Sequence, residues 1–155
     1  YAFMPHKGNW EDANVWQESE RFNLYLTAGQ LAPTAHGKNP TVHSFLELKD
    51  ENLNVSAVKR SEDGTGYIVR LFNPSDKTIK NAIRLNGGIA PIEKPQSPVE
   101  RQQAEFELPA YSGKAWSEAK LVTLEELDDK ALTINADGFV DFEITGKKIL
   151  TIKFN

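Results

Sequence analysis

The sequence contains no cysteine, and methionine occurs only once. The absence of cysteine excludes a disulfide framework, a thiolate metal site and a cysteine nucleophile, and it is typical of a cytoplasmic protein, the location we expect. No apolar run approaches the roughly 20 residues that a helix needs to cross a bilayer. The 18 basic residues are scattered, and the net charge is −4. We therefore expect neither a membrane nor a nucleic acid as a partner.

Short runs of alternating apolar and polar residues, separated by turn signals, dominate the middle of the chain. Residues 53–57 alternate, and a glycine-rich reversal at 62–66 leads into an apolar run at 67–72. A turn centred on Asn73-Pro74 then precedes a second alternating run at 78–85. Alternation with a period of two predicts β-strands that bury one face. The pattern favours an antiparallel architecture, in which each sheet has one apolar and one polar side.

The C-terminus carries the clearest pair of strands. A turn at Thr145-Gly146-Lys147 separates two alternating runs, which predicts a β-hairpin. Burial of one aliphatic or aromatic side chain is worth about 1.5–3 kcal/mol, so we expect the apolar faces in the core. These faces consist of Val140, Phe142, Ile144, Leu150, Ile152 and Phe154. The fold class that the sequence predicts is all-β: an antiparallel β-sandwich with one short surface helix near the N-terminus.

That helix is expected at Glu11–Glu20. Asn9 can cap its first turn, and acidic residues near the start favour the positive end of the helix dipole. Trp16 belongs to a narrow apolar stripe, through which the helix should dock on the sandwich. An apolar run at Tyr1–Met4 predicts a strand that begins at the first residue. Because this strand has no polar lead-in, we expect the chain to be a fragment of a longer protein.

Two segments lack a regular period, 27–43 and 87–103, and the second contains three prolines. Proline is confined to edges and loops of sheets, so the second segment should be a surface loop. The first should connect two parts of the chain. Residues 1–43 would form a strand–helix–strand segment and connector, the end of a preceding β-domain. Residues 44–155 would form the C-terminal antiparallel β-sandwich.

The sequence offers little for catalysis or metal binding. The histidines His6, His36 and His43 lack the short spacing that is typical of a zinc site. The acidic pairs, such as Glu62-Asp63, lie in turns or would point to opposite faces of a strand, which does not favour a catalytic dyad. We therefore assign no catalytic, cofactor-binding or metal-binding residue. His6 is expected to be structural at the end of a strand, with a cleft between domains as the alternative.

Aromatic residues suggest a different role, because a sandwich with exposed, coplanar rings can stack on sugars. Burial is the usual state of tryptophan, and it is the favoured interpretation for Trp116. Tyr111, which follows Pro109-Ala110, is the better candidate for exposure. The residues expected to contact sugar or another domain are His6, Trp10, Tyr111 and Trp116.

Several short motifs occur in a recognisable order along the chain. The opening is Phe3-x-Pro5-His6-x-Gly8-x-Trp10, followed by Arg21-Phe22-Asn23 and by Ser44-Phe45-Leu46-Glu47-Leu48. Next come the stretches at 55–64, 69–74, 125–127 and 149–152. In combination they resemble the C-terminal β-region of family-38 glycoside hydrolases, the zinc-dependent class II α-mannosidases, and in particular the last β-sandwich of bacterial α-mannosidases.

The resemblance implies that the zinc ligands and the aspartate nucleophile belong to an N-terminal domain that this chain lacks. Zinc is then a cofactor of that domain only, and this chain alone would be inactive. Its expected partners are the catalytic domain of its own protein, carbohydrate through the parent enzyme, and further copies of itself. Two alternatives stay open: a carbohydrate-binding module, and a structural or oligomerisation domain.

Overall fold

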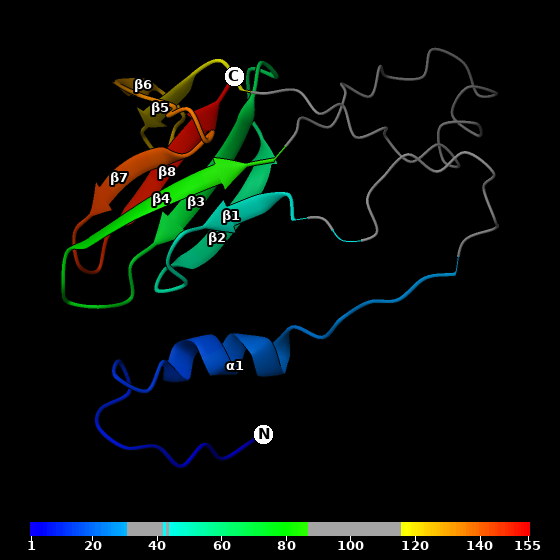
Figure 1. Ribbon diagram of the computed structural model, residues 1–155, viewed down its shortest axis with the longest axis vertical. Helices are drawn as coiled ribbons and strands as arrows, with labels where there is room; N and C mark the ends of the chain where they lie inside the picture. Colours follow the sequence, from blue (N-terminus) through cyan, green and yellow to red (C-terminus); the bar gives the residue numbers. More distant parts are fainter. Residues whose placement is uncertain (31–41, 43, 87–115) are drawn as a thin grey trace.

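The computed structural model describes residues 1–30, 42, 44–86 and 116–155. Within these ranges the chain forms one helix and eight strands arranged as two antiparallel sheets (Figure 1). The three-stranded sheet has the order β1-β4-β7, with β1 at Leu46–Leu48, β4 at Ile79–Leu85 and β7 at Val140–Ile144. The five-stranded sheet has the order β2-β3-β8-β5-β6. Its strands are β2 (Asn54–Arg60), β3 (Tyr67–Phe72), β8 (Ile149–Phe154), β5 (Ala119–Val122) and β6 (Asp128–Leu132).

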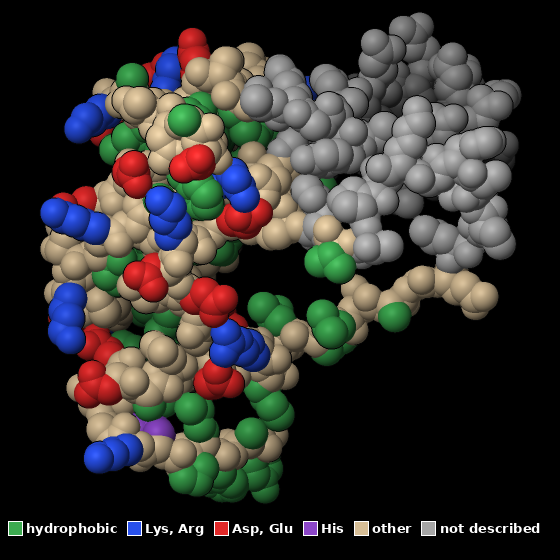
Figure 2. Space-filling view, viewed as in Figure 1, with side chains coloured by type: hydrophobic (Ala, Val, Ile, Leu, Met, Phe, Trp, Pro, Cys, Tyr) green, Lys and Arg blue, Asp and Glu red, His purple; other side chains and the backbone are tan. Residues whose placement is uncertain are grey.

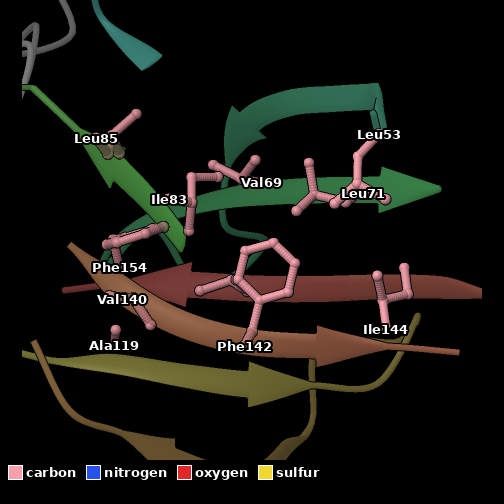
Figure 3. Close-up of a cluster of buried hydrophobic side chains, with 11 residues drawn as sticks. Leu53, Val69, Leu71, Ile83, Leu85, Ala119, Val140, Phe142, Ile144 and Phe154 are labelled. Carbon is pink, nitrogen blue, oxygen red and sulfur yellow. The ribbon is translucent and has the colours of Figure 1, made fainter. Parts of the chain in front are cut away.

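The core lies between the two sheets, as a sandwich requires (Figure 3). Fully buried aliphatic side chains such as Val69 and Leu71 in one sheet face Ile83 and Val140 in the other. Of the six apolar residues expected in the core near the C-terminus, five are buried, and Leu150 is half-buried against the same cluster. The predicted fold class, an antiparallel β-sandwich with one short helix, is confirmed.

The predicted C-terminal hairpin is wrong in its pairing. Strands β7 and β8 form with the expected alternation, but β7 pairs with β4 and β8 pairs with β3 and β5. The turn between them therefore crosses from one sheet to the other. Alternation cannot distinguish the two arrangements, because a hairpin and a crossing turn both leave the same face of each strand in the core.

Asn73 joins this crossing turn to another one, between β3 and β4. Its side chain is fully buried, and its Nδ2 donates to the carbonyls of Lys77, Ile144 and Thr145 at 2.8, 3.2 and 3.2 Å. Its Oδ1 accepts the backbone N–H of Ser75 at 3.0 Å. Gly146 lies in close contact with the carbonyl of Asp76, where a Cβ would clash. The two turns therefore pack as one unit at this end of the sandwich.

The N-terminal helix begins further along the chain than the sequence predicts. Helix α1 spans Val15–Asn23 rather than Glu11–Glu20. Asn9 does accept a backbone N–H, from Asp12 at 2.8 Å, but this bond caps an irregular turn before the helix. Asn14, in a left-handed conformation, interrupts the chain between that turn and α1. None of the described helical residues could form a span long and apolar enough for a bilayer.

The expected strand at Tyr1–Met4 does not form, because residues 1–6 have no regular structure and are exposed. With no neighbouring strand in the described chain to complete its hydrogen bonds, an isolated strand there would gain little. The alternation expected at 53–57 is also interrupted. A bulge adds Ser56 to β2 opposite β3, so Val55 pairs with the buried Leu71, whereas Ala57 pairs with Arg70 and Val58 with the buried Val69.

Candidate functional site

Three of the four residues that were expected to contact sugar fall within the described residues. His6 lies exposed in the irregular N-terminal segment. Trp10 is 43% exposed, and the Nζ atom of Lys147 lies 5.1 Å from its ring centroid. Tyr111 falls outside the described residues, as do His36 and His43. Trp116 belongs to the sandwich, where it packs against the hydrophobic core.

Trp116 extends the hydrophobic core rather than forming a platform. Its ring packs edge-on against Tyr67, with centroids 5.5 Å apart, and lies 6.2 Å from the ring of Phe154. Its indole Nε1 donates to the backbone carbonyl of Leu85 at 2.8 Å. A half-buried indole whose only N–H is already bonded has little left with which to recognise a sugar hydroxyl.

The outer face of the five-stranded sheet is covered by two loops of the same chain. The β2–β3 loop places Asp63 beside Lys153, and the two side chains pair at 2.6 Å. The β5–β6 loop places Glu126 beside Lys59 at 2.7 Å, where Glu126 also accepts the backbone N–H of Glu62 at 2.7 Å. Beneath the loops, the outward-facing side chain of Lys153 is only 7% exposed. The two loops therefore close this face of the sheet.

The electrostatics of these loops do not suit acid catalysis. Hydrogen bonds from Lys153, Ser61 and Thr65 hold the pKa of Asp63 well below its ordinary value. Hydrogen bonds from Lys59 and from the Glu62 backbone lower the pKa of Glu126 in the same way. A general acid at neutral pH needs a raised pKa, so these ionised carboxylates act as partners for lysine.

The outer face of the three-stranded sheet carries charges around an open hollow of about 560 Å³. Lys80 and Glu143 pair there at 3.8 Å, with both side chains largely exposed. Beside the hollow, Arg84 lies 4.7 Å from the ring centroid of Phe139, and Lys49 lies 5.0 Å from it. Two cationic side chains thus lie close to the aromatic ring of Phe139, and the ring is therefore poorly suited to stack on a sugar.

Figure 1 shows α1 beside the sandwich, on the side where β1 and β2 lie. A groove lined by residues of α1, β1 and β2 lies between them. We call it the α1 groove. Its volume is about 430 Å³, and its apolar lining consists of Trp16, Leu24, Leu48, Leu53 and Val55. Its polar lining consists of Gln17, Glu20, Arg21 and Glu51. Figure 2 shows hydrophobic side chains bordering the hollow between the α1 segment and the sandwich.

Polar contacts hold α1 against the sandwich. Arg21 pairs with Glu51 at 2.9 Å, and Gln17 donates to the backbone carbonyl of Glu51. Asn54, at the start of β2, donates to the carboxylate of Glu20. No residue of α1 is buried, so the helix contacts the sandwich but does not share a buried apolar core with it.

Large apolar side chains are exposed along the N-terminal segment. Of the fifteen that are exposed in the described residues, eight lie within residues 1–30. They are Tyr1, Phe3, Met4, Trp10, Phe22, Leu24, Tyr25 and Leu26. Leu26 is 99% exposed and Leu24 is 72% exposed, immediately beyond the C-terminal end of α1. Such a concentration of exposed apolar side chains in one segment is typical of a site of interaction with another protein surface.

Among the described residues, no group of three or more histidine, aspartate or glutamate side chains converges as a metal site would require. A comparison with models of protein families identifies the family of the chain. The model of the glycosyl hydrolases family 38 C-terminal beta sandwich domain matches residues 52–152, from just before β2 into β8. The chain belongs to this family. The predicted resemblance is thereby confirmed.

This chain also resembles a curated protein, Alpha-mannosidase G of Dictyostelium discoideum. The two are 33% identical over 76 residues. That stretch covers 46% of this chain and 7% of the relative, so the family 38 chain spans a small part of the relative's length. The residues of α1, and most of those that line the α1 groove, precede the part that the family model matches.

Sequence reasoning missed the α1 groove and the pairing of Asp63 with Lys153. The acidic pair Glu62-Asp63 was interpreted as a solvated turn. The missed signal was Lys153, an outward-facing lysine between the core residues Ile152 and Phe154. A lysine on the outer face of a central strand needs a nearby carboxylate if it is to be buried, and a hairpin loop can supply one.

Proposed function

We propose that this chain is the non-catalytic β-sandwich part of an α-mannosidase-like glycoside hydrolase. Its role is to pack against the catalytic part of the same protein and to support it. The observation that carries the proposal is the family match, which covers the sandwich from the region of β2 into β8. The exposed apolar residues of the N-terminal segment supply a surface through which such packing would occur.

The chemistry of the described carboxylates supports a non-catalytic role. Glycosidases place two carboxylic groups on either side of the scissile bond, and one of them must donate a proton. Asp63 and Glu126 instead have lowered pKa values, caused by lysine partners. The parent would cleave α-mannosidic bonds with zinc bound outside this chain, and no step of that reaction is assigned to a residue here.

The direct test is hydrolysis of a nitrophenyl α-mannoside with added zinc. We expect no release of nitrophenol by the 155-residue chain alone, and release by the longer protein that contains it. In the longer protein, Ile83→Asp should abolish activity, because it places a charge in the sandwich core. Zinc-stimulated hydrolysis by the 155-residue chain would refute the non-catalytic role. An α-mannoside left intact by the longer protein would refute the parent activity.

Carbohydrate binding is the second candidate, and the exposure of Trp10 favours it. Calorimetric titration with methyl α-mannoside and α-mannobiose tests this role. Saturable heat that disappears in Trp10→Ala or Tyr111→Ala would establish a sugar-binding module. Absence of heat at millimolar ligand would leave packing against the catalytic part as the function.

A further inference from the structure

The edges of both sheets carry features that discourage pairing with another chain. Strand β1 has only three residues, and β7 carries Asp141 and Glu143. Strands β2 and β6 each contain a bulge, at Ser56 and at Asp129. Short strands, bulges and charged side chains are the usual protections of an edge. A partner is therefore not expected to add a strand to either sheet.

The outer faces of the sheets are equally unsuited to an apolar partner. Loops cover one face and pair its lysines with Asp63 and Glu126. The other face is charged, and Lys49 and Arg84 surround its aromatic ring, Phe139. Within the described residues, the α1 groove differs from these surfaces because it combines an apolar lining with a concave shape.

The charges around the α1 groove indicate what its occupant should carry. Glu18 and Glu51 both pair with Arg21, at 2.5 and 2.9 Å, and Glu20 accepts a hydrogen bond from Asn54. Three carboxylates thus lie on or beside α1 near the groove with a single guanidinium group, which pairs with two of them. The rim has an excess of negative charge, and a cation in the partner would complement it.

We infer that the α1 groove is the docking site for a segment of the same protein that lies outside this chain. This segment is apolar and carries a neighbouring basic residue. The inference rests on the proposed function, since it takes the occupant from the catalytic part. The relative named above has ample chain to supply such a segment, because the matched stretch is 7% of its length. The apolar side chains of the segment fill the groove beside Leu24 and Val55, and its basic residue lies near Glu51.

Photo-crosslinking in the longer protein tests this assignment. A benzophenone amino acid is placed at Val55, which lines the groove, and in a second variant at Val58. Val58 is a matched control, because it lies on the same strand, has the same side chain and is also exposed, at 52%. The Val55 variant should crosslink within one polypeptide to an apolar segment outside these 155 residues, and Val58 should give at most a small fraction of that yield.

A substitution in the groove provides the second measurement. Leu24→Glu should lower the crosslinking yield from Val55 by on the order of tenfold, because it places a charge in an apolar contact. Leu26→Glu is the control, since Leu26 is more exposed and does not line the groove. It should leave the yield within about twofold, as is usual for a side chain outside the centre of an interface.

Three outcomes would overturn the inference. Crosslinked species of twice the mass would assign the groove to a second copy of the protein. Crosslinks confined to these 155 residues would assign it to the chain itself, and equal yields from Val55 and Val58 would show that nothing docks there. The proposed function is tested separately by mannoside hydrolysis. Hydrolysis without crosslinking would refute the groove assignment alone, whereas a longer protein without α-mannosidase activity would refute the proposed function.

Discussion

Replacing Asn73 with alanine should destabilise the sandwich more than a change in a turn normally does. The side chain bonds four backbone groups from two different crossing turns, and it is fully buried. After substitution, the carbonyl of Lys77 keeps a hydrogen bond from the Ser75 hydroxyl at 3.2 Å. The Ser75 N–H and the carbonyls of Ile144 and Thr145 lose the side-chain partner that the structure gives them.

The expected loss follows from these three groups. Each buried backbone group left without a partner costs about 1–3 kcal/mol. Thr145 is exposed, so water can replace part of its bond. We therefore expect the free energy of unfolding to fall by about 2–4 kcal/mol. For a domain of this size, that loss corresponds to a fall in melting temperature of roughly 4–16 °C.

Urea denaturation of the 155-residue chain measures this loss, with Asn23→Ala as the control. Asn23 also makes two side-chain hydrogen bonds, to Ser19, but it is exposed, and its substitution should cost less than about 0.5 kcal/mol. Equal losses in the two variants would refute the reasoning. Asn73→Asp adds a check, because its carboxylate would face carbonyl oxygens. That variant should be less stable than Asn73→Ala at neutral pH, and its deficit should shrink in acid as burial raises the pKa of the new carboxyl.

The remaining predictions concern other features of the sandwich. Because the pKa of Asp63 is lowered on folding, its contribution to stability is present above the ordinary aspartate range and is lost as the pH falls below it. Asp63→Asn should therefore flatten this acidic part of the stability profile, and an unchanged profile would count against the ion pair. Trp116→Ala should lower the free energy of unfolding by about 3–5 kcal/mol without altering any heat of sugar binding, and a change in that heat would show a ligand contact. Gly146→Ala should cost about 1–3 kcal/mol, because its Cβ would meet the carbonyl of Asp76. Gly29→Ala, which has open space around the new methyl group, should be neutral in the same denaturation assay, and equal losses would contradict the close packing.

Alternation in the sequence predicts which face of a strand is buried, but it does not predict which strands pair. Val140, Phe142 and Ile144 could be placed in the core because a period of two fixes which face of a strand is buried. Their partner strand could not be predicted, because β7 would show the same pattern in a hairpin with β8. The bulge at Ser56 is also invisible in the pattern, yet it places Val58 rather than Ala57 on the same face of β2 as Val55.

The candidate site could be predicted only in part. Burial of Trp116 was the favoured interpretation, because a large apolar ring between polar neighbours gains most from packing. Glu126, which pairs with Lys59, and Asp63, which pairs with Lys153, come from loops far from these lysines in the sequence. Such pairs depend on how two loops fold over one sheet, and a local pattern carries no information about that. The α1 groove is equally non-local, since the helix and β2 meet across a segment without periodicity.

The difference between the surfaces of this chain gives a physical reason for docking at the α1 side. Buried lysine on the outer face of the five-stranded sheet already has its carboxylate within the chain, so a partner there would have to break that pair. Leu24, by contrast, is 72% exposed, and its removal from water would break no hydrogen bond. Burial of such a side chain stabilises an interface at roughly 25 cal/mol per Å² before the costs of association. Burial of apolar surface, which stabilises the sandwich core, is therefore still available along α1. A segment of the catalytic part that fits this groove would be stabilised by the same burial.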